Sequence, residues 1–146
     1  MDCSNAPTVW PKVVINEIRS TPNPDFVELY NTTDGDVDLS SWKLIDDGVI
    51  EDAFVFPAGT ILPANGFLVV EGEGSPESTP LKLPFGLGSS DQVRLYGPCG
   101  DLIDSHSWTS HVNTARRCPD GGTWDEQNAG SDTAGTKGAS NEGDCP

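Results

Sequence analysis

Two carboxylates lie at equivalent points of two predicted strands. Glu17 belongs to the strand-like segment 13–18, and Glu28 belongs to the segment 26–30. Because side chains alternate along a strand, the two could share one face of a sheet. A carboxylate pair can serve as acid and base or hold a metal ion. No further group near this pair specifies a reaction, so hydrogen bonds to loop backbone or exposure to solvent is the simpler interpretation.

The sequence contains two histidines, and each follows a serine, in Ser105-His106 and Ser110-His111. Neighbours on a strand point to opposite faces, which prevents contact between a nucleophile and its base. The chain also lacks the Gly-x-Ser-x-Gly turn that activates a serine in one large hydrolase class. We therefore predict that the chain is not an enzyme.

Acidic residues alternate along one predicted turn, at Asp34, Asp36 and Asp38. The calcium-hand loop requires Gly at its sixth position and Glu at its twelfth. Counted from Asp34, these positions hold Leu39 and Ile45, so that pattern fails. Asp side chains that cap backbone amides of a turn explain the stretch equally well.

A second acidic stretch, Asp46, Asp47, Glu51 and Asp52, leaves a different calcium geometry open. Calcium is therefore the one cofactor that we consider, and otherwise we expect none.

Three tryptophans, Trp10, Trp108 and Trp124, lie outside the clearest strand runs. Exposed aromatic rings stack on sugars and anchor protein interfaces, which makes these residues candidate binding groups. The alternative is that they seal the ends of the fold.

The four cysteines form no Cys-x-x-Cys pair, so zinc or thioredoxin-like chemistry has no support. Wide spacing and an even count indicate two disulfides and an oxidising compartment. We predict Cys118–Cys145, which would anchor a tail poor in apolar residues, and Cys3–Cys99, which would fasten the N-terminal arm. The rival pairing joins Cys99 to Cys118 and Cys3 to Cys145.

The charge balance limits the partners. The chain has 146 residues, 23 acidic and 8 basic, with a formal net charge of −15. Such a field repels phosphate backbones, so we expect no nucleic-acid partner. Acidity also keeps an extracellular protein soluble. No apolar run is long enough to cross a bilayer, so we expect no membrane span.

Short strand signals recur from about residue 13 to 117, separated by Gly, Pro, Asn and Asp. No segment has a sustained helical apolar period, so the pattern predicts an all-β sandwich or barrel. Residues 1–12 should form an N-terminal arm, 13–124 the sandwich, and 125–146 a polar tail packed on or tethered to it. Alternation predicts a core that contains Val27, Leu29, Trp42, Leu44, Phe54, Phe56, Leu68, Val70, Val93 and Leu95.

The order of motifs resembles the lamin tail domain family. The resemblance begins with the segments 14–18, 26–31 and 37–44 and continues through 56–60, 62–70 and 85–87. It ends with 91–96, 100–105, 117–121 and 135–141. The family implies an immunoglobulin-like β-sandwich and carries no catalytic residues. Its bacterial members occur in exported proteins, often beside hydrolase domains.

We therefore expect a non-catalytic lamin-tail-like module of a secreted bacterial protein. It would mediate protein or cell-surface contact, or support an adjacent hydrolase domain in the full-length protein. The alternative is a β-sandwich that binds calcium or carbohydrate.

Overall fold

The computed structural model describes residues 3–72, 74–75, 81–128 and 137–141. Within these residues the secondary structure is almost entirely β. The two helices, η1 (Cys3–Asn5) and η2 (Ile50–Asp52), are single 3₁₀ turns. The strands are β1 (Val13–Arg19), β2 (Phe26–Asn31), β3 (Val37–Asp38), β4 (Lys43–Ile45), β5 (Phe54–Val55), β6 (Ile61–Leu62), β7 (Phe67–Glu71), β8 (Asp91–Tyr96), β9 (Leu102–Trp108), β10 (Val112–Cys118) and β11 (Thr123–Asn128).

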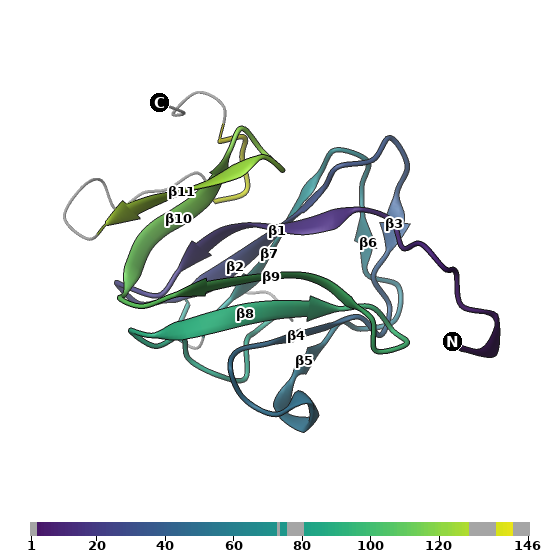
Figure 1. The fold of residues 1–146 in the computed structure, drawn as a ribbon, viewed down its shortest axis with the longest axis horizontal. Helices are drawn as coiled ribbons and strands as arrows, with labels where there is room; N and C mark the ends of the chain where they lie inside the picture. Colours follow the sequence, from purple (N-terminus) through teal and green to yellow (C-terminus); the bar gives the residue numbers. More distant parts are fainter. Residues whose placement is uncertain (1–2, 73, 76–80, 129–136, 142–146) are drawn as a thin grey trace.

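Two larger sheets form the layers of a sandwich (Figure 1). One has the order β11-β10-β1-β2-β7, and the other has the order β5-β4-β8-β9. β3 and β6 form a separate two-stranded sheet, and all pairings between these strands are antiparallel. An isolated parallel bridge joins Glu71 of β7 to Lys82. Residues 97–101 form the turn of the hairpin that joins β8 to β9.

Apolar side chains from both sheets fill the space between the layers. Nine of the ten predicted core residues are buried; the exception, Leu68, is half-buried and packs against the same cluster. Period-2 alternation identified these residues because each of their strands turns one face to the core and the other outward.

A bulge in β1 controls which side chains face outward. Ile15 lies opposite Leu29, but the next aligned pair is Glu17 and Glu28, which leaves Asn16 as the extra residue. The bulge keeps Ile15 and the later β1 residues in phase with the core. It also places both glutamates side by side on the outer face.

The last two strands extend the five-stranded sheet. β11 runs to Asn128, past residue 124, where the sequence analysis ended the sandwich. This hairpin lies at an edge of the sheet and has few apolar residues, so it lacks the alternation that marked earlier strands.

Candidate functional site

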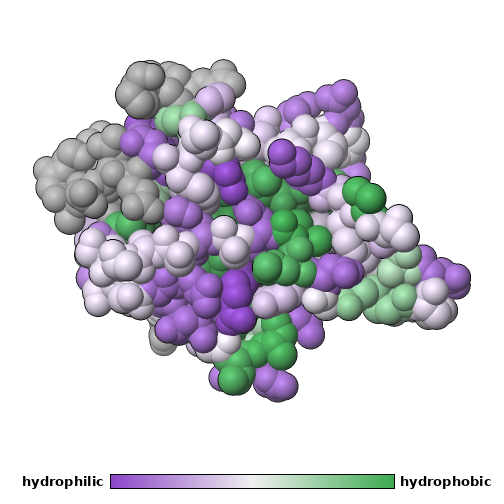
Figure 2. All heavy atoms as spheres, viewed as in Figure 1, coloured by the Kyte–Doolittle hydropathy of each residue, from purple (hydrophilic) through white to green (hydrophobic). Residues whose placement is uncertain are grey.

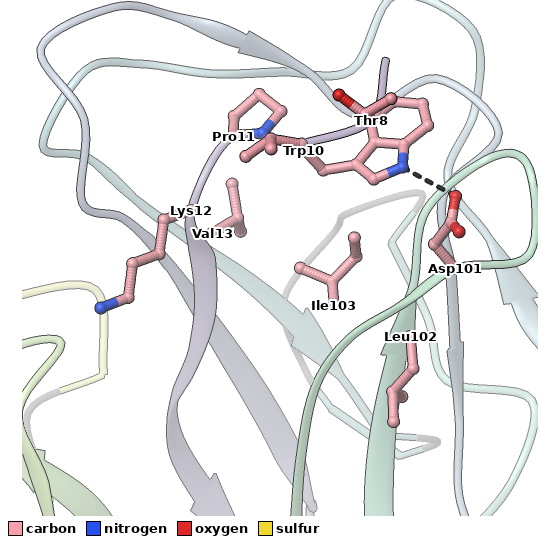
Figure 3. Close-up of a pocket in the computed structure, with 9 residues that line it drawn as sticks. Thr8, Trp10, Pro11, Lys12, Val13, Asp101, Leu102 and Ile103 are labelled. Atoms are coloured by element: carbon pink, nitrogen blue, oxygen red, sulfur yellow. Dashed lines mark hydrogen bonds between the residues drawn. The ribbon is translucent and has the colours of Figure 1, made fainter. Parts of the chain in front are cut away.

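A groove lies beside Trp10, between the N-terminal arm and the start of β9 (Figure 3). Its volume is about 490 Å³. The groove is lined by Thr8, Val9, Trp10, Pro11, Lys12, Val13, Asp101, Leu102 and Ile103.

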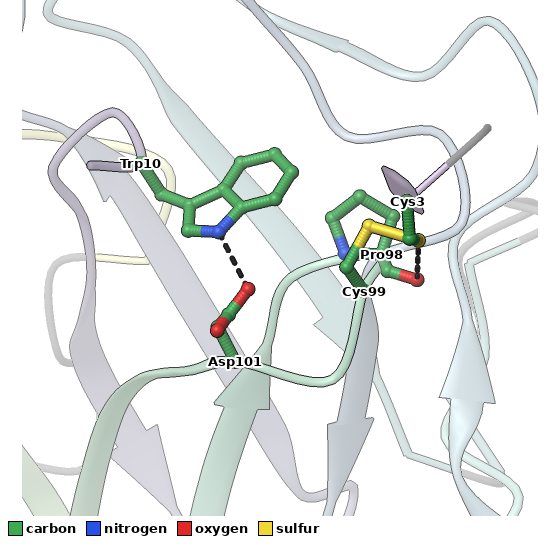
Figure 4. Close-up of a disulfide and its surroundings, with 5 residues drawn as sticks. All are labelled: Cys3, Trp10, Pro98, Cys99 and Asp101. Atoms are coloured by element: carbon green, nitrogen blue, oxygen red, sulfur yellow. Dashed lines mark hydrogen bonds between the residues drawn. A yellow bond between two sulfur atoms is a disulfide. The ribbon is translucent and has the colours of Figure 1, made fainter. Parts of the chain in front are cut away.

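Two contacts hold the arm that forms one wall of the groove (Figure 4). The predicted disulfide between Cys3 and Cys99 is present and ties the arm to the β8–β9 turn. The Trp10 indole N–H donates to Asp101 Oδ2 at 2.8 Å. The indole ring also packs edge-on against the core residue Trp42, with ring centroids 6.0 Å apart. The groove is therefore pre-formed.

The groove is suited to contact. Val9 is 81% exposed and Leu102 is 56% exposed, so apolar side chains meet solvent on both sides of it. Apolar atoms gather over this region in Figure 2. The ionisable groups of the lining are Lys12 and Asp101, and the latter already accepts the Trp10 hydrogen bond. Within this lining no hydroxyl or amine hydrogen-bonds to the Asp101 carboxylate, so no nucleophile is paired with a base.

The other two tryptophans occupy different settings. Trp108 is 5% exposed and donates its indole N–H to the Gly88 carbonyl, so it is a core residue and its candidacy as a surface binding group was wrong. Trp124 is half-buried between two polar side chains. The His106 ring stacks on the Trp124 ring, with the ring centroids 3.7 Å apart. The Arg117 guanidinium carbon lies 4.8 Å from the centroid of the Trp124 ring. Trp124 therefore helps to fasten the β10–β11 hairpin to β9.

A serine–histidine contact is present, although not between the residues adjacent in sequence. His111 Nδ1 lies 2.9 Å from Ser20 Oγ. Ser20 is buried, and its hydroxyl oxygen accepts from the Val112 backbone N–H at 2.9 Å. This hydrogen bond links the end of β1 to the start of β10, so the hydroxyl has a structural role. Sequence reasoning missed this contact because the two residues are 91 positions apart.

Asp25 lies close enough to His111 for the two side chains to interact electrostatically, but the Asp25 carboxylate forms its hydrogen bond with a different residue. Asp25 Oδ2 accepts from the Leu87 N–H at 2.8 Å, and burial raises the pKa of Asp25. The Asp25 carboxylate forms no hydrogen bond to His111 within the described residues. The arrangement therefore does not reproduce the hydrogen-bonded chain of a serine hydrolase triad.

Glu17 and Glu28 share one face, as predicted, and both are fully buried. Glu28 Oε2 accepts from the Gly138 backbone N–H at 2.6 Å, and its Oε1 accepts from the Asn16 amide at 3.2 Å. The predicted bond to loop backbone is thus confirmed. The pKa of Glu28 is raised to about 8, chiefly because burial disfavours the carboxylate. The charges of Glu17 and Asp120 also raise it, and the hydrogen bonds from Gly138 and Asn16 lower it.

Residues 137–141 lie against Glu28, through the Gly138 N–H, and we call them the closing segment. Asp120 holds one end of it: Oδ1 accepts from the Asn141 N–H at 3.0 Å and Oδ2 from the Ser140 hydroxyl at 2.7 Å. At the other end the Lys137 ammonium lies 2.8 Å from Glu71 Oε1. These carboxylates therefore have a structural role, in holding the end of the described chain against the sheet.

In the first acidic stretch, Asp36 and Asp38 accept hydrogen bonds from the backbone of turns. Asp38 Oδ1 accepts from the Ser40 N–H and hydroxyl, which lowers the pKa of Asp38. Asp36 Oδ1 accepts from the Ala64 N–H at 3.0 Å, and Asp34 is exposed. The structure does not bring these three together as a metal site within the residues it describes.

The second acidic stretch does form a cluster. Carboxylate oxygens of Asp46, Asp47 and Asp91 lie within 4.8 Å of one another. Asp91 was not a predicted ligand, because it lies on β8, far along the sequence. Two of the three carboxylates also cap local backbone: Asp46 accepts from the Gly48 N–H, and Asp91 from those of Asp47 and Gly88.

Cys118 is also disulfide-bonded. Its predicted partner, Cys145, lies outside the described residues.

The family comparison agrees with this architecture. The lamin tail domain family matches residues 7–110, which is more than half of the chain. The chain therefore belongs to the lamin tail domain family and is an immunoglobulin-like β-sandwich. No curated protein matches the chain significantly. Among the residues described, no helix is long and apolar enough to cross a bilayer.

Proposed function

We propose that the chain is a non-catalytic contact module of a secreted bacterial protein. It would bind a protein or cell-surface partner, or support an adjacent hydrolase domain. The Trp10 groove carries this proposal, because it is pre-formed and bordered by exposed apolar side chains, and because its one carboxylate, on Asp101, already accepts the Trp10 hydrogen bond. The Cys3–Cys99 disulfide fits an extracellular environment.

Retention of the fluorescently labelled chain on the envelope of the host cell tests this function. We expect saturable retention that Leu102→Asp weakens, because a charge would enter the groove wall. Thr109→Asp is the matched control, since Thr109 is exposed and lies outside the groove. The same preparation should remain at background with phosphoester, ester and glycoside substrates. Turnover of any of these substrates, or retention that does not saturate, would contradict the proposal.

Calcium binding is a second candidate, favoured by the cluster of Asp46, Asp47 and Asp91. Oxygen ligands suit calcium, and a ligand that binds only the folded state raises the melting temperature. We expect calcium to raise the melting temperature of the wild type and not that of Asp91→Asn. An equal response of both proteins would refute a site at this cluster.

A further inference from the structure

A second exposed apolar surface lies at η2 and β5, away from the Trp10 groove. We define the η2–β5 surface as residues 46–55. Val49 is 61% exposed, Val55 is 49% exposed and Ile50 is 38% exposed. In Figure 2 apolar atoms gather at the end of the molecule where Figure 1 places η2. β5 is the last strand of its sheet, so its outer edge pairs with no other strand of the described chain.

Carboxylates surround these apolar side chains. Residues 46–55 contain Asp46, Asp47, Glu51 and Asp52 and no basic residue. Glu51 and Asp52 are exposed, and their side chains form no hydrogen bond within the described part of the chain. Unlike Asp46, which caps a turn, they have no local structural role.

The cations nearest this surface leave its acidic character in place. The Arg94 guanidinium is held by the carbonyls of Asp46, at 2.7 Å, and Gly48, at 2.5 Å. Lys43 lies opposite Val55 in the strand register, so one ammonium borders the apolar residues. Within the described residues, the four carboxylates of the η2–β5 surface therefore outnumber the one ammonium that the strand register places beside it.

A hollow of about 510 Å³ adjoins the same surface. Asp46, Glu51 and Asp52 form its acidic side, and Pro84 and Phe85 form its apolar side. A lysine or arginine side chain fits such a lining, because its aliphatic stem can lie along the proline and the phenylalanine while its charge meets the carboxylates.

We propose that the η2–β5 surface docks a basic, apolar segment of a partner protein, an inference that rests on the proposed contact function. Valine and isoleucine side chains of this surface would be buried at the centre of the contact, and basic residues of the partner would meet the acidic rim. The net charge of −15 would steer such a segment toward the chain. The same charge opposes docking of a second copy or of nucleic acid.

Fluorescence anisotropy with the full chain tests this docking. The probe is a short labelled peptide in which lysines flank a leucine-valine stretch. Two control peptides replace either the lysines by glutamates or the apolar residues by serines. We expect saturable binding of the probe alone, weakened severalfold by added salt, because exposed charges are screened.

Variants assign the site. We expect Ile50→Ser to weaken probe binding about three- to sixfold, since Ile50 is 38% exposed and docking would bury only that part of its apolar surface. Glu51→Gln with Asp52→Asn should weaken it severalfold and remove much of the salt dependence. Leu102→Ser, in the Trp10 groove, and Asp34→Asn, at another exposed acid, are the matched controls and should bind as the wild type does.

Each other outcome overturns the inference. No binding of the probe, equal binding of the control peptides, or wild-type affinity in both η2–β5 variants would each do so. Loss of binding in Leu102→Ser alone would refute docking at η2–β5 and leave the contact function of the Trp10 groove intact. Loss of both the envelope retention and the probe binding would refute the proposed function as well.

Discussion

Glu28→Gln should remove most of the pH dependence of stability between about pH 4.5 and 8. The pKa of Glu28 is about 8 in the folded chain, against an ordinary value of 4.5, because burial disfavours the carboxylate. A folded-state pKa above the unfolded one means that the stabilisation is fully present below pH 4.5 and is lost as the pH rises through 8. At about 1.4 kcal/mol per pH unit, the loss at pH 7 is on the order of 3 kcal/mol.

Thermal melts from pH 4.5 to 8 measure this effect. Gln is neutral like the protonated Glu and can still accept from the Gly138 N–H, but its amide nitrogen cannot accept from the Asn16 amide, which keeps its bond to Asp120. At pH 7 we expect Glu28→Gln to melt several degrees above the wild type, and near pH 4.5 a few degrees below it, because the lost hydrogen bond is worth about 1 kcal/mol. Asp34→Asn removes an exposed charge and should leave the slope unchanged. Parallel curves for the wild type and Glu28→Gln, or a wild type that gains stability over this range, would refute the reasoning.

Three further results are expected. Cys3→Ser should cost roughly 4–5 kcal/mol in the chain-entropy model, because the lost bond joins residues 96 positions apart, and urea unfolding of Cys3→Ser and of the wild type, both without reductant so that the Cys118 disulfide stays intact, measures it. Asp120→Ala should cost about 2–3 kcal/mol and expose the closing segment to proteases, since the Asn16, Ser140 and Asn141 donors lose their acceptor. Duplex DNA at near-physiological salt should show no gel shift with the chain; a salt-sensitive shift would mean that the net charge misled us.

Much of the fold was predictable because burial imposes alternation. Trp42 and Leu44, for example, lie two residues apart and both face the core. The bulge at Asn16 was not predictable, since it depends on the pairing of β1 with β2 and on the backbone of both strands. β11 was not predicted as a strand, because an edge strand can carry polar side chains on both faces and then shows no apolar alternation.

The candidate site was harder to predict than the fold. The disulfide partners Cys3 and Cys99 followed from chain position, and Trp10 was a candidate because it lay outside the core runs. The groove itself forms only when the arm meets β9. Asp91 joins Asp46 and Asp47, and His111 meets Ser20, through tertiary contacts between segments far apart in sequence.

Site-specific photocrosslinking in the host cell tests most directly whether this chain acts through its surface. A benzophenone amino acid would replace Leu102 in the Trp10 groove, Ile50 on the η2–β5 surface, or the exposed control residue Thr109. We expect a discrete covalent adduct from Leu102 or Ile50 and none from Thr109. Adducts of equal yield at all three positions, or none at any of them, would contradict this expectation.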